Sequence, residues 1–544
     1  MANVSLVTNG LLAIFGGNMI TFLIGLVVLF VGGAIYGKFV ENIFAPDDRP
    51  TPAMVKRDGL DYIPMPKWKN MLIELLNIAG TGPILGPIQG ILFGPLAFIL
   101  IPIGNVLGGA VHDYFSGMLS VRNNGDQMPA LIRRFMGNAT YHIYNVFACL
   151  LMFLVGVVFL YLPGDLIAGL IGVPTTVGEG ESITKLIPLF VIYGIILLYY
   201  LLASITPIDK IIGRVYPIFG AVLIISAVGI LGALFVRGYI FDTSLMPNWI
   251  PGAVYPEGAP YGVLVPDGAI TPSNLVPIFF ITVACGITSG FHSSQAALIA
   301  RSVPDERQGR STFYNMMVAE GLIAMIWAAG AMVIYNMGAQ VATANSTEMV
   351  SVISMTFLGA VGGVLTILGV IVLPITSGDT ALRSLRMMVG DYFHIDQRKR
   401  SNVVIMALVI FALVLGVLIF AKVNPNGFNI LWRYFGFANE ALAVFAFGMG
   451  AIYLAGRFDK PFYLICLIPG AFYMFVVTSY IFSAPIGFHL SWTISYVLGA
   501  IFTVIYIAAI LRAGMKRNKG IKAGTVENTD VYETPAQVKL DQEK

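Results

Sequence analysis

The sequence predicts an all-α polytopic membrane protein built from two inverted five-helix repeats, each opened by a discontinuous helix, with extra spans at both ends. Three observations support this fold class. Of the 544 residues, 57% are hydrophobic and 11% are charged, whereas soluble domains carry about 25% charged residues. Apolar runs long enough to cross a bilayer recur along the whole chain. Two of these runs, at matched positions, are interrupted by glycine-rich stretches.

The apolar runs predict thirteen spans, because a helix needs about 20 apolar residues to cross a hydrocarbon core of about 30 Å. They lie at residues 11–36, 71–94, 96–120, 141–162, 186–205, 213–236, 274–300, 312–335, 352–380, 402–421, 430–455, 461–482 and 490–512. We expect one membrane domain over 1–544, in which an extra N-terminal span at 11–36 precedes the repeats. The first repeat is expected at 71–236, the second at 274–455 and the C-terminal spans at 461–512, followed by a disordered cytoplasmic tail at 513–544.

The distribution of Lys and Arg predicts the orientation, because basic residues accumulate in cytoplasmic loops. With the N-terminus outside, the alternate loops place all but four of the 32 basic residues on the cytoplasmic side. The four exceptions are Lys185, Arg237, Lys422 and Arg433. The basic stretch "RAGMKRNKGIK" is explained by anionic membrane lipid, so no nucleic-acid partner is expected.

The three cysteines argue against a disulfide-rich or metal-binding protein, and the N-terminal sequence argues against a cleaved signal peptide. Cys149, Cys285 and Cys466 lie in different apolar runs without paired spacing, which predicts neither a disulfide framework nor a metal site. The first run lacks a basic n-region and a clear cleavage site, so we expect a retained span rather than a signal peptide.

The first interrupted run reads "NIAGTGPILGPIQG" at residues 77–90 and holds five glycines and prolines in the eight residues 80–87. Glycine and proline are the poorest helix formers, and hydrocarbon cannot satisfy the backbone groups that a broken helix frees. Such a break persists where it is buried in protein or lines a wet cavity. The candidate substrate-binding residues here are Gly80, Thr81, Gly82 and Gly86.

The second interrupted run, "ITVACGITSGFHSSQAALIA" at 281–300, begins the second block of five spans. Its candidate substrate-binding residues are Gly286, Ser289, Gly290, His292 and Ser293. Matched breaks are typical of inverted-repeat transporters, in which freed carbonyls coordinate cations and half-helix N-termini face anionic groups. We expect both breaks to face one cavity. The alternative is that these glycines only allow close helix packing.

Ionisable side chains inside spans are a further indication of function, because they are expensive to keep in hydrocarbon. His112 and Asp113 lie together in 96–120, and a histidine beside a carboxylate is suited to relaying protons. Glu440 in 430–455 is a candidate proton carrier without a basic partner within a helical turn. Glu320 is a weaker candidate because it is expected near the membrane interface. The alternative for His112 and Asp113 is a structural hydrogen bond between helices.

Five motifs occur in an order that resembles the carbon starvation protein A (CstA) family, over about residues 70 to 480. The motifs are "AGTGPILGP" (79–87), "GGAVHDYF" (108–115), "FITVACGITSGFH" (280–292), "NILWRYFGFANEALA" (429–443) and "LIPGAFY" (467–473). That family is similar to the amino acid–polyamine–organocation superfamily with its inverted five-helix repeats. Many members have Gln in place of His112 and Glu440, and the stretch after "SGFH" also differs here.

The resemblance implies uptake of peptides, or of pyruvate in some members, during carbon starvation. In the superfamily, the region that corresponds to "PITSGDTALRS" (374–384) joins the first broken helix to hold sodium. Hydroxyl and carboxylate oxygens are suitable ligands for this hard cation, and a capping and turn segment is the alternative. The residues concerned are Thr376, Ser377, Asp379 and Thr380.

We therefore expect a secondary active uptake transporter in the bacterial inner membrane, coupled to H+ or Na+, with peptide or pyruvate as substrate. A channel, and a membrane nutrient sensor or enzyme, are the alternatives. The sequence offers no nucleophile triad, metal cluster or nucleotide-binding loop, so neither enzymatic activity nor a cofactor is expected.

Overall fold

The computed structural model describes residues 20–57, 62–90, 93, 96–175, 182–205, 209–237, 274–337, 346–396, 399–424 and 427–526. All regular elements in this part of the chain are helices, which confirms the all-α class. Within the described residues, eleven helices are long and apolar enough to cross a membrane, and a bent pair makes twelve. A shorter apolar helical segment, Gly220–Val236, occupies the position of the remaining predicted span.

The helices follow the predicted runs along the chain. They are α2 (Ile20–Val27), α3 (Gly33–Phe44), α4 (Pro52–Val55), α5 (Lys67–Ile78), α6 (Gly82–Gln89), α7 (Ala97–Gly104), α8 (Ala110–Arg122), α9 (Met128–Met136), α10 (Asn138–Ile171), α11 (Ile187–Ile205), α12 (Asp209–Val236), α13 (Leu275–Val283), α14 (Gly290–Ile299), α15 (Asn315–Met337), α16 (Ser346–Tyr392), α17 (Arg400–Val423), α18 (Gly427–Arg457), α19 (Leu464–Ser483) and α20 (Trp492–Lys522). Helix α16 is kinked at Gly359, whose φ of +70° suits a residue without a side chain.

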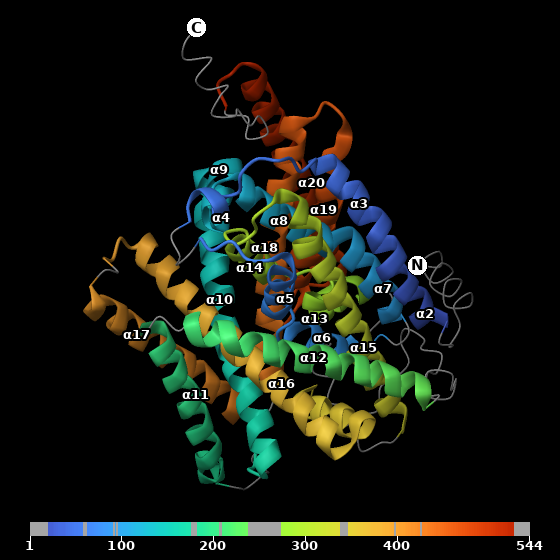
Figure 1. Ribbon diagram of the computed structural model, residues 1–544, viewed down its shortest axis with the longest axis vertical. Coiled ribbons are helices and arrows are strands. Elements are labelled where there is room, and N and C mark those ends of the chain that lie inside the picture. Colours follow the sequence, from blue (N-terminus) through green and yellow to red (C-terminus); the bar gives the residue numbers. More distant parts are fainter. Residues whose placement is uncertain are drawn as a thin grey trace.

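Burial separates a central group of helices from a lipid-facing group. The most apolar stretches of Leu275–Ile299 and Ile430–Arg457 are 94% buried, whereas that of Trp492–Lys522 is 17% buried. Figure 1 shows α5, α6, α13, α14 and α18 near the middle of the molecule and α11 and α17 at its periphery. Both interrupted runs therefore lie inside protein, where backbone groups that leave a helix can find partners.

The first break is narrower than the sequence predicts. Helix α5 ends at Ile78 and α6 begins at Gly82, with a bend of 47° between them. Residues 79–81 are non-helical, whereas Gly82 to Gly86 belong to α6. Pro83 lies in the first turn of α6, where its missing N–H removes no helix hydrogen bond.

The second break lies where the sequence predicts it. Helix α13 ends at Val283, a 3-10 turn follows at Ala284–Gly286, and α14 begins at Gly290. Ala284 has a φ of +30°, which is a strained conformation for a residue with a side chain. Surrounding contacts must therefore hold this break in place.

Helices α3, α10, α16 and α20 extend 8 to 12 residues beyond their predicted ends. In α10 and α20, tertiary contacts hold the added turns. Helix α10 continues through Pro163 to Ile171, since Gly164 packs on the Tyr193 ring and Asp165 pairs with a lysine of α17. Helix α20 continues to Lys522, so the prediction of disorder is wrong for 513–522; residues 527–544 lie outside the described part of the chain.

Candidate functional site

The two broken helices meet directly at their glycines. A Cβ atom on Gly82 would overlap the side chain of Cys285, and one on Gly86 would lie 2.5 Å from the carbonyl oxygen of Val283. The expected cavity is therefore closed at these two glycines. In this conformation they act as packing contacts, which is the alternative that the sequence left open.

The second break is held between α15 and α18. A Cβ on Gly286 would lie 2.7 Å from the Cβ of Ala324 in α15. A Cβ on Gly290 would overlap Leu442 and the backbone of Asn439 in α18. Any side chain at either glycine would therefore push the break away from a neighbouring helix.

Asn439 satisfies the polar groups of the second break. Its Oδ1 accepts hydrogen bonds from the Ser289 hydroxyl and from the Phe291 backbone N–H, both at 3.0 Å. Its Nδ2 donates to the sulfur of Cys285 at 3.0 Å. Asn439 thus caps the N-terminus of α14. We did not predict this role, although an amide next to Glu440 in an apolar run is the signal that points to it.

The hydroxyl groups at the two breaks differ in their partners. The Ser293 hydroxyl donates to the carbonyl oxygen of Gly290 at 2.7 Å. The Thr81 hydroxyl, at the N-terminus of α6, is fully buried and has no hydrogen-bond partner. Of the hydroxyls predicted to bind substrate, Thr81 is therefore the one that an incoming polar group can engage without displacing a protein partner.

Four of the predicted ionisable residues form one buried cluster on α8, α14 and α15. Nδ1 of His112 lies 2.8 Å from Oδ1 of Asp113, and Nδ1 of His292 lies 3.2 Å from Oδ2 of the same carboxylate. On its other side, Nε2 of His292 lies 3.5 Å from Oε1 of Glu320. Each of the four side chains is at most 1% exposed. His292 therefore bridges two carboxyl groups.

Glu74 of α5 belongs to the same cluster and was missed by the sequence reasoning. Its side chain is fully buried, and neither carboxyl oxygen has a hydrogen-bond partner. It interacts electrostatically with both Asp113 and Glu320. A carboxyl group within "MLIELLNIAG" meets the same criterion that singled out Glu440, because it also lies inside an apolar run.

The ionisable groups of this cluster cannot reach zero net charge with protons on the two imidazoles alone. Its three carboxyl groups, on Glu74, Asp113 and Glu320, outnumber its two imidazoles. If both imidazoles were protonated and all carboxyls ionised, one negative charge would remain. An uncompensated buried charge costs several kcal/mol. The cluster must therefore hold at least one additional proton or one cation.

Glu440 lies beside the second break, on the α18 side. It is fully buried, and both of its carboxyl oxygens lack a hydrogen-bond partner. Its electrostatic neighbours include Cys285 and Tyr473, and Cys285 also interacts with Glu320. Glu440 therefore shares a neighbour with the cluster, and its role as a proton carrier stays a prediction.

The residues predicted to hold sodium lie inside α16, which packs against α5 and α6. The helix continues past them, so a capping and turn segment is excluded. The Thr376 and Thr380 hydroxyls donate to carbonyl oxygens of their own helix, both at 2.8 Å. Asp379 is buried and accepts from the Tyr199 hydroxyl at 3.0 Å, while the buried Ser377 hydroxyl has no partner. A sodium role stays a prediction.

Arg122, at the end of α8, forms a buried ion pair that the sequence reasoning did not identify. Its Nε and Nη2 donate to the two carboxylate oxygens of Glu306, each at 3.0 Å. It also donates to the Tyr453 hydroxyl and to the Ala45 carbonyl oxygen, both at 2.9 Å. Arg122 thus joins the end of α8 to the segment between α14 and α15, to α18 and to the residue after α3.

Nearby, Arg49 donates to both carboxylate oxygens of Asp47, and these hydrogen bonds hold the pKa of Asp47 below its ordinary value. Arg49 also lies 3.6 Å from Glu306. The chain between α3 and α4 is therefore fixed to the same ionic network.

A second buried ion pair joins α10 to α17. Nζ of Lys422 lies 2.6 Å from Oδ2 of Asp165, whose other oxygen accepts from the Tyr193 hydroxyl. The Lys422 ammonium also lies 4.0 Å from the centre of the Tyr161 ring. Lys422 is one of the four basic residues that the predicted orientation places outside. Its ion pair with Asp165 explains how its charge is accommodated at the end of a span.

No group of three His, Cys, Asp or Glu side chains in the described residues is arranged to hold a metal ion. The chemistry that the arrangement offers is proton exchange among carboxyl and imidazole groups, next to two broken helices.

Comparisons with known proteins agree with this architecture. A family model described as carbon starvation protein CstA matches residues 17–235, 189–353 and 331–481. An uncharacterized membrane protein of Haemophilus influenzae is 40% identical over 332 residues, which cover 57% of this chain and 89% of that protein. A peptide transporter CstA of Bacillus subtilis is 24% identical over 85% of this chain and 90% of its own length.

Other relatives align over shorter shares of their length. The pyruvate/proton symporter BtsT of Escherichia coli is 26% identical over 51% of this chain and 43% of that protein. This chain likewise spans about half the length, 48%, of a curated Campylobacter jejuni relative.

A solved manganese transporter of Eremococcus coleocola has the same overall fold. It is matched with a TM-score of 0.50 and 11% identity, over 86% of this chain and 99% of that protein. The family model covers well over half of this sequence, including both broken helices. The chain therefore belongs to the carbon starvation protein CstA family.

Proposed function

We propose that this protein is a proton-driven secondary transporter that imports a peptide or a short carboxylate such as pyruvate across the bacterial inner membrane. The observation that carries the proposal is the buried cluster of Glu74, His112, Asp113, His292 and Glu320, which needs an additional proton or cation for charge balance. Relatives named as a peptide transporter and a pyruvate/proton symporter support the same function.

The position of the cluster supports a link between proton binding and transport. Glu74 lies on α5, the first half of one broken helix, and His292 lies on α14, the second half of the other. Asp113 and Glu320 connect these half-helices through α8 and α15. A change of charge in the cluster therefore changes the forces between the two broken helices. This coupling is what a symporter requires.

The cluster favours H+ over Na+ as the coupling ion. Hard cations such as Na+ prefer several oxygen ligands. Both carboxylate oxygens of Asp113 face an imidazole nitrogen. Imidazole nitrogens exchange protons near neutral pH and are poor ligands for Na+. Sodium is the second candidate, because the buried Asp379 and the unpartnered Ser377 hydroxyl lie on α16 beside the first broken helix.

The first break supports a substrate that carries a carboxylate. Peptides and pyruvate both carry a carboxylate, and the N-terminus of α6 combines the positive end of the helix dipole with the unpartnered Thr81 hydroxyl. A helix N-terminus attracts an anion without a full positive charge. The corresponding end of α14 is already capped by Asn439, so we place the carboxylate at α6.

Uptake into proteoliposomes with an imposed pH gradient tests the proposal. Labelled pyruvate is compared with labelled di- and tripeptides, and Na+ is replaced by choline in a parallel series. We expect accumulation of one substrate class above its outside concentration, without a need for Na+. A channel would only equilibrate the substrate, and an enzyme would convert it without accumulation. Accumulation that requires Na+ and ignores pH would overturn the proton assignment.

A further inference from the structure

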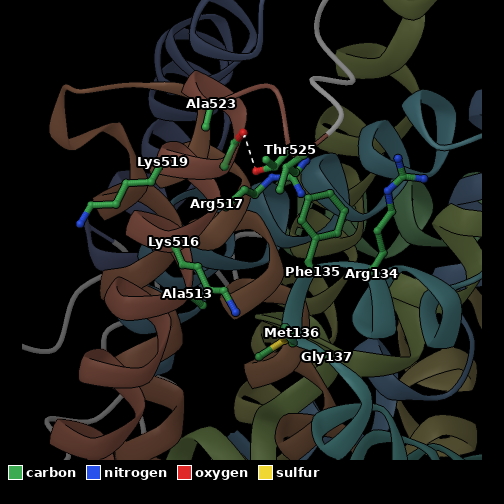
Figure 2. Close-up of a pocket in the computed structure, with 12 residues that line it drawn as sticks. Arg134, Phe135, Met136, Gly137, Ala513, Lys516, Arg517, Lys519, Ala523 and Thr525 are labelled. Atoms are coloured by element: carbon green, nitrogen blue, oxygen red, sulfur yellow. Dashed lines mark hydrogen bonds between the residues drawn. The ribbon is translucent and has the colours of Figure 1, made fainter.

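A basic cavity lies between α9 and the C-terminal end of α20. It has a volume of about 630 Å³. Its basic side chains are Arg134 of α9 and Lys516, Arg517 and Lys519 of α20, and no acidic residue is among the described residues that line it. Figure 2 shows Arg517 beside Phe135 and Thr525, whereas the side chains of Lys519 and Arg134 point away from the ring on opposite sides. The cavity is therefore a strongly positive site.

The cavity has a packed apolar floor. Phe135, Met136 and Ala513 line its inner side. The guanidinium carbon of Arg517 lies 4.6 Å from the centre of the Phe135 ring, so stacking orients this side chain. The neighbouring Asn518 donates to the carbonyl oxygen of Gly456 at 3.1 Å, which fixes the end of α20 against α18. An oriented guanidinium is well suited to a phosphate group.

The cavity adjoins a surface that faces lipid. Along α20, Val504 and Ile505 are 65% and 57% exposed, and Met515, next to Lys516, is 59% exposed. These exposed apolar side chains form the outer face of a helix that crosses the membrane. The basic residues begin where this apolar face ends, which is the level expected for lipid headgroups.

We propose that this cavity binds the phosphate headgroup of an anionic phospholipid, whose acyl chains lie along the outer face of α20. Arg517 and the two lysines neutralise the phosphate, and the apolar floor accepts the glycerol backbone. A soluble phosphate would satisfy the same basic groups, but it would make no use of the adjoining apolar face. This site is independent of the proposed transport cycle.

Native mass spectrometry of the full-length protein in detergent tests the site, after addition of equal amounts of phosphatidylglycerol and phosphatidylcholine. We expect the wild-type protein to retain phosphatidylglycerol preferentially. In the double variant Lys516→Gln/Lys519→Gln, the ratio of bound phosphatidylglycerol to bound phosphatidylcholine should fall about tenfold, because each basic residue near a membrane surface contributes measurably to anionic-lipid binding. The matched control Lys399→Gln/Arg400→Gln removes the same charge from exposed positions at the start of α17. It should keep the preference for phosphatidylglycerol.

A second variant, Ala513→Phe, fills the floor without changing any charge and should also reduce retention. Equal losses in both charge variants would show general electrostatic attraction and overturn the site. Undiminished retention by Ala513→Phe would overturn the role of the cavity. Displacement of the lipid by millimolar inorganic phosphate would identify a site for a soluble anion and overturn the lipid assignment.

Discussion

Replacement of Glu320 by Gln should separate transport from its driving force. Gln keeps the shape of the side chain and an oxygen near Nε2 of His292, which lies 3.5 Å from Glu320 in the native protein. The change leaves the carboxyls of Glu74 and Asp113 with the imidazoles of His112 and His292. The two remaining carboxyl groups and the two imidazoles reach zero net charge with one proton fewer than the native cluster, so the variant no longer requires the additional proton.

The magnitude follows from the number of protons that the cluster exchanges. One pH unit corresponds to about 1.4 kcal/mol per proton. A symporter that moves one proton with each substrate can therefore accumulate the substrate about tenfold per pH unit. Glu320→Gln should reduce this ratio to about one, because loss of the exchanged proton removes the whole driving force. Exchange of labelled for unlabelled substrate needs no net proton movement and should persist.

The assay compares gradient-driven accumulation with substrate exchange in the same proteoliposomes. Glu348→Gln is the matched control, because Glu348 is an exposed carboxyl group in the first turn of α16. The control should accumulate substrate like the wild-type protein. If Glu320→Gln accumulates substrate about tenfold per pH unit, the charge-balance reasoning is refuted. If it loses exchange as well, Glu320 has a structural or substrate-binding role instead.

Three further variants test other parts of the structure. Gly82→Ala should abolish uptake, because the added methyl group would force the two breaks apart. The second change Cys285→Gly should restore part of the uptake by removing the overlapping side chain. No rescue in the double variant would count against this packing explanation. Arg122→Met should lower the free energy of unfolding by about 3 kcal/mol, because it removes one partner of a buried ion pair. This is the lower end of the range for such a loss, since Arg49 lies 3.6 Å from Glu306 and still offsets part of its charge. An unchanged thermal unfolding midpoint would contradict this expectation. Glu440→Gln should abolish accumulation but spare exchange if Glu440 carries a proton, and an unchanged pH profile would exclude that role.

The sequence predicts the parts of the fold that depend on local composition. Glycines and prolines within apolar runs locate both broken helices, because those residues are costly in any helix that lipid surrounds. The ends of α10 and α20 were not predictable in this way. Gly164 and Asp165 resemble a helix stop in isolation, and only the Tyr193 ring and Lys422 show why the helix continues.

The site is predictable as a set of residues but not as an arrangement. Apolar context alone singles out Asp113, His292 and Glu320, yet the contact between Asp113 and His292 joins residues 179 positions apart. Glu74 met the same criterion and was overlooked beside the more conspicuous glycines. The cap by Asn439 depends on how α18 packs against α14, which no local pattern reveals.

Proton movement during uptake tests the central claim most directly. Proteoliposomes that contain a trapped pH-sensitive dye, with the membrane potential clamped at zero and the pH equal on both sides, receive the substrate identified by uptake. Protein-free liposomes correct for passive entry of the protonated acid. We predict acidification of the interior at one proton per substrate molecule in the wild-type protein and none in Glu320→Gln. Substrate entry through the wild-type protein at an unchanged internal pH would contradict proton coupling through the buried cluster.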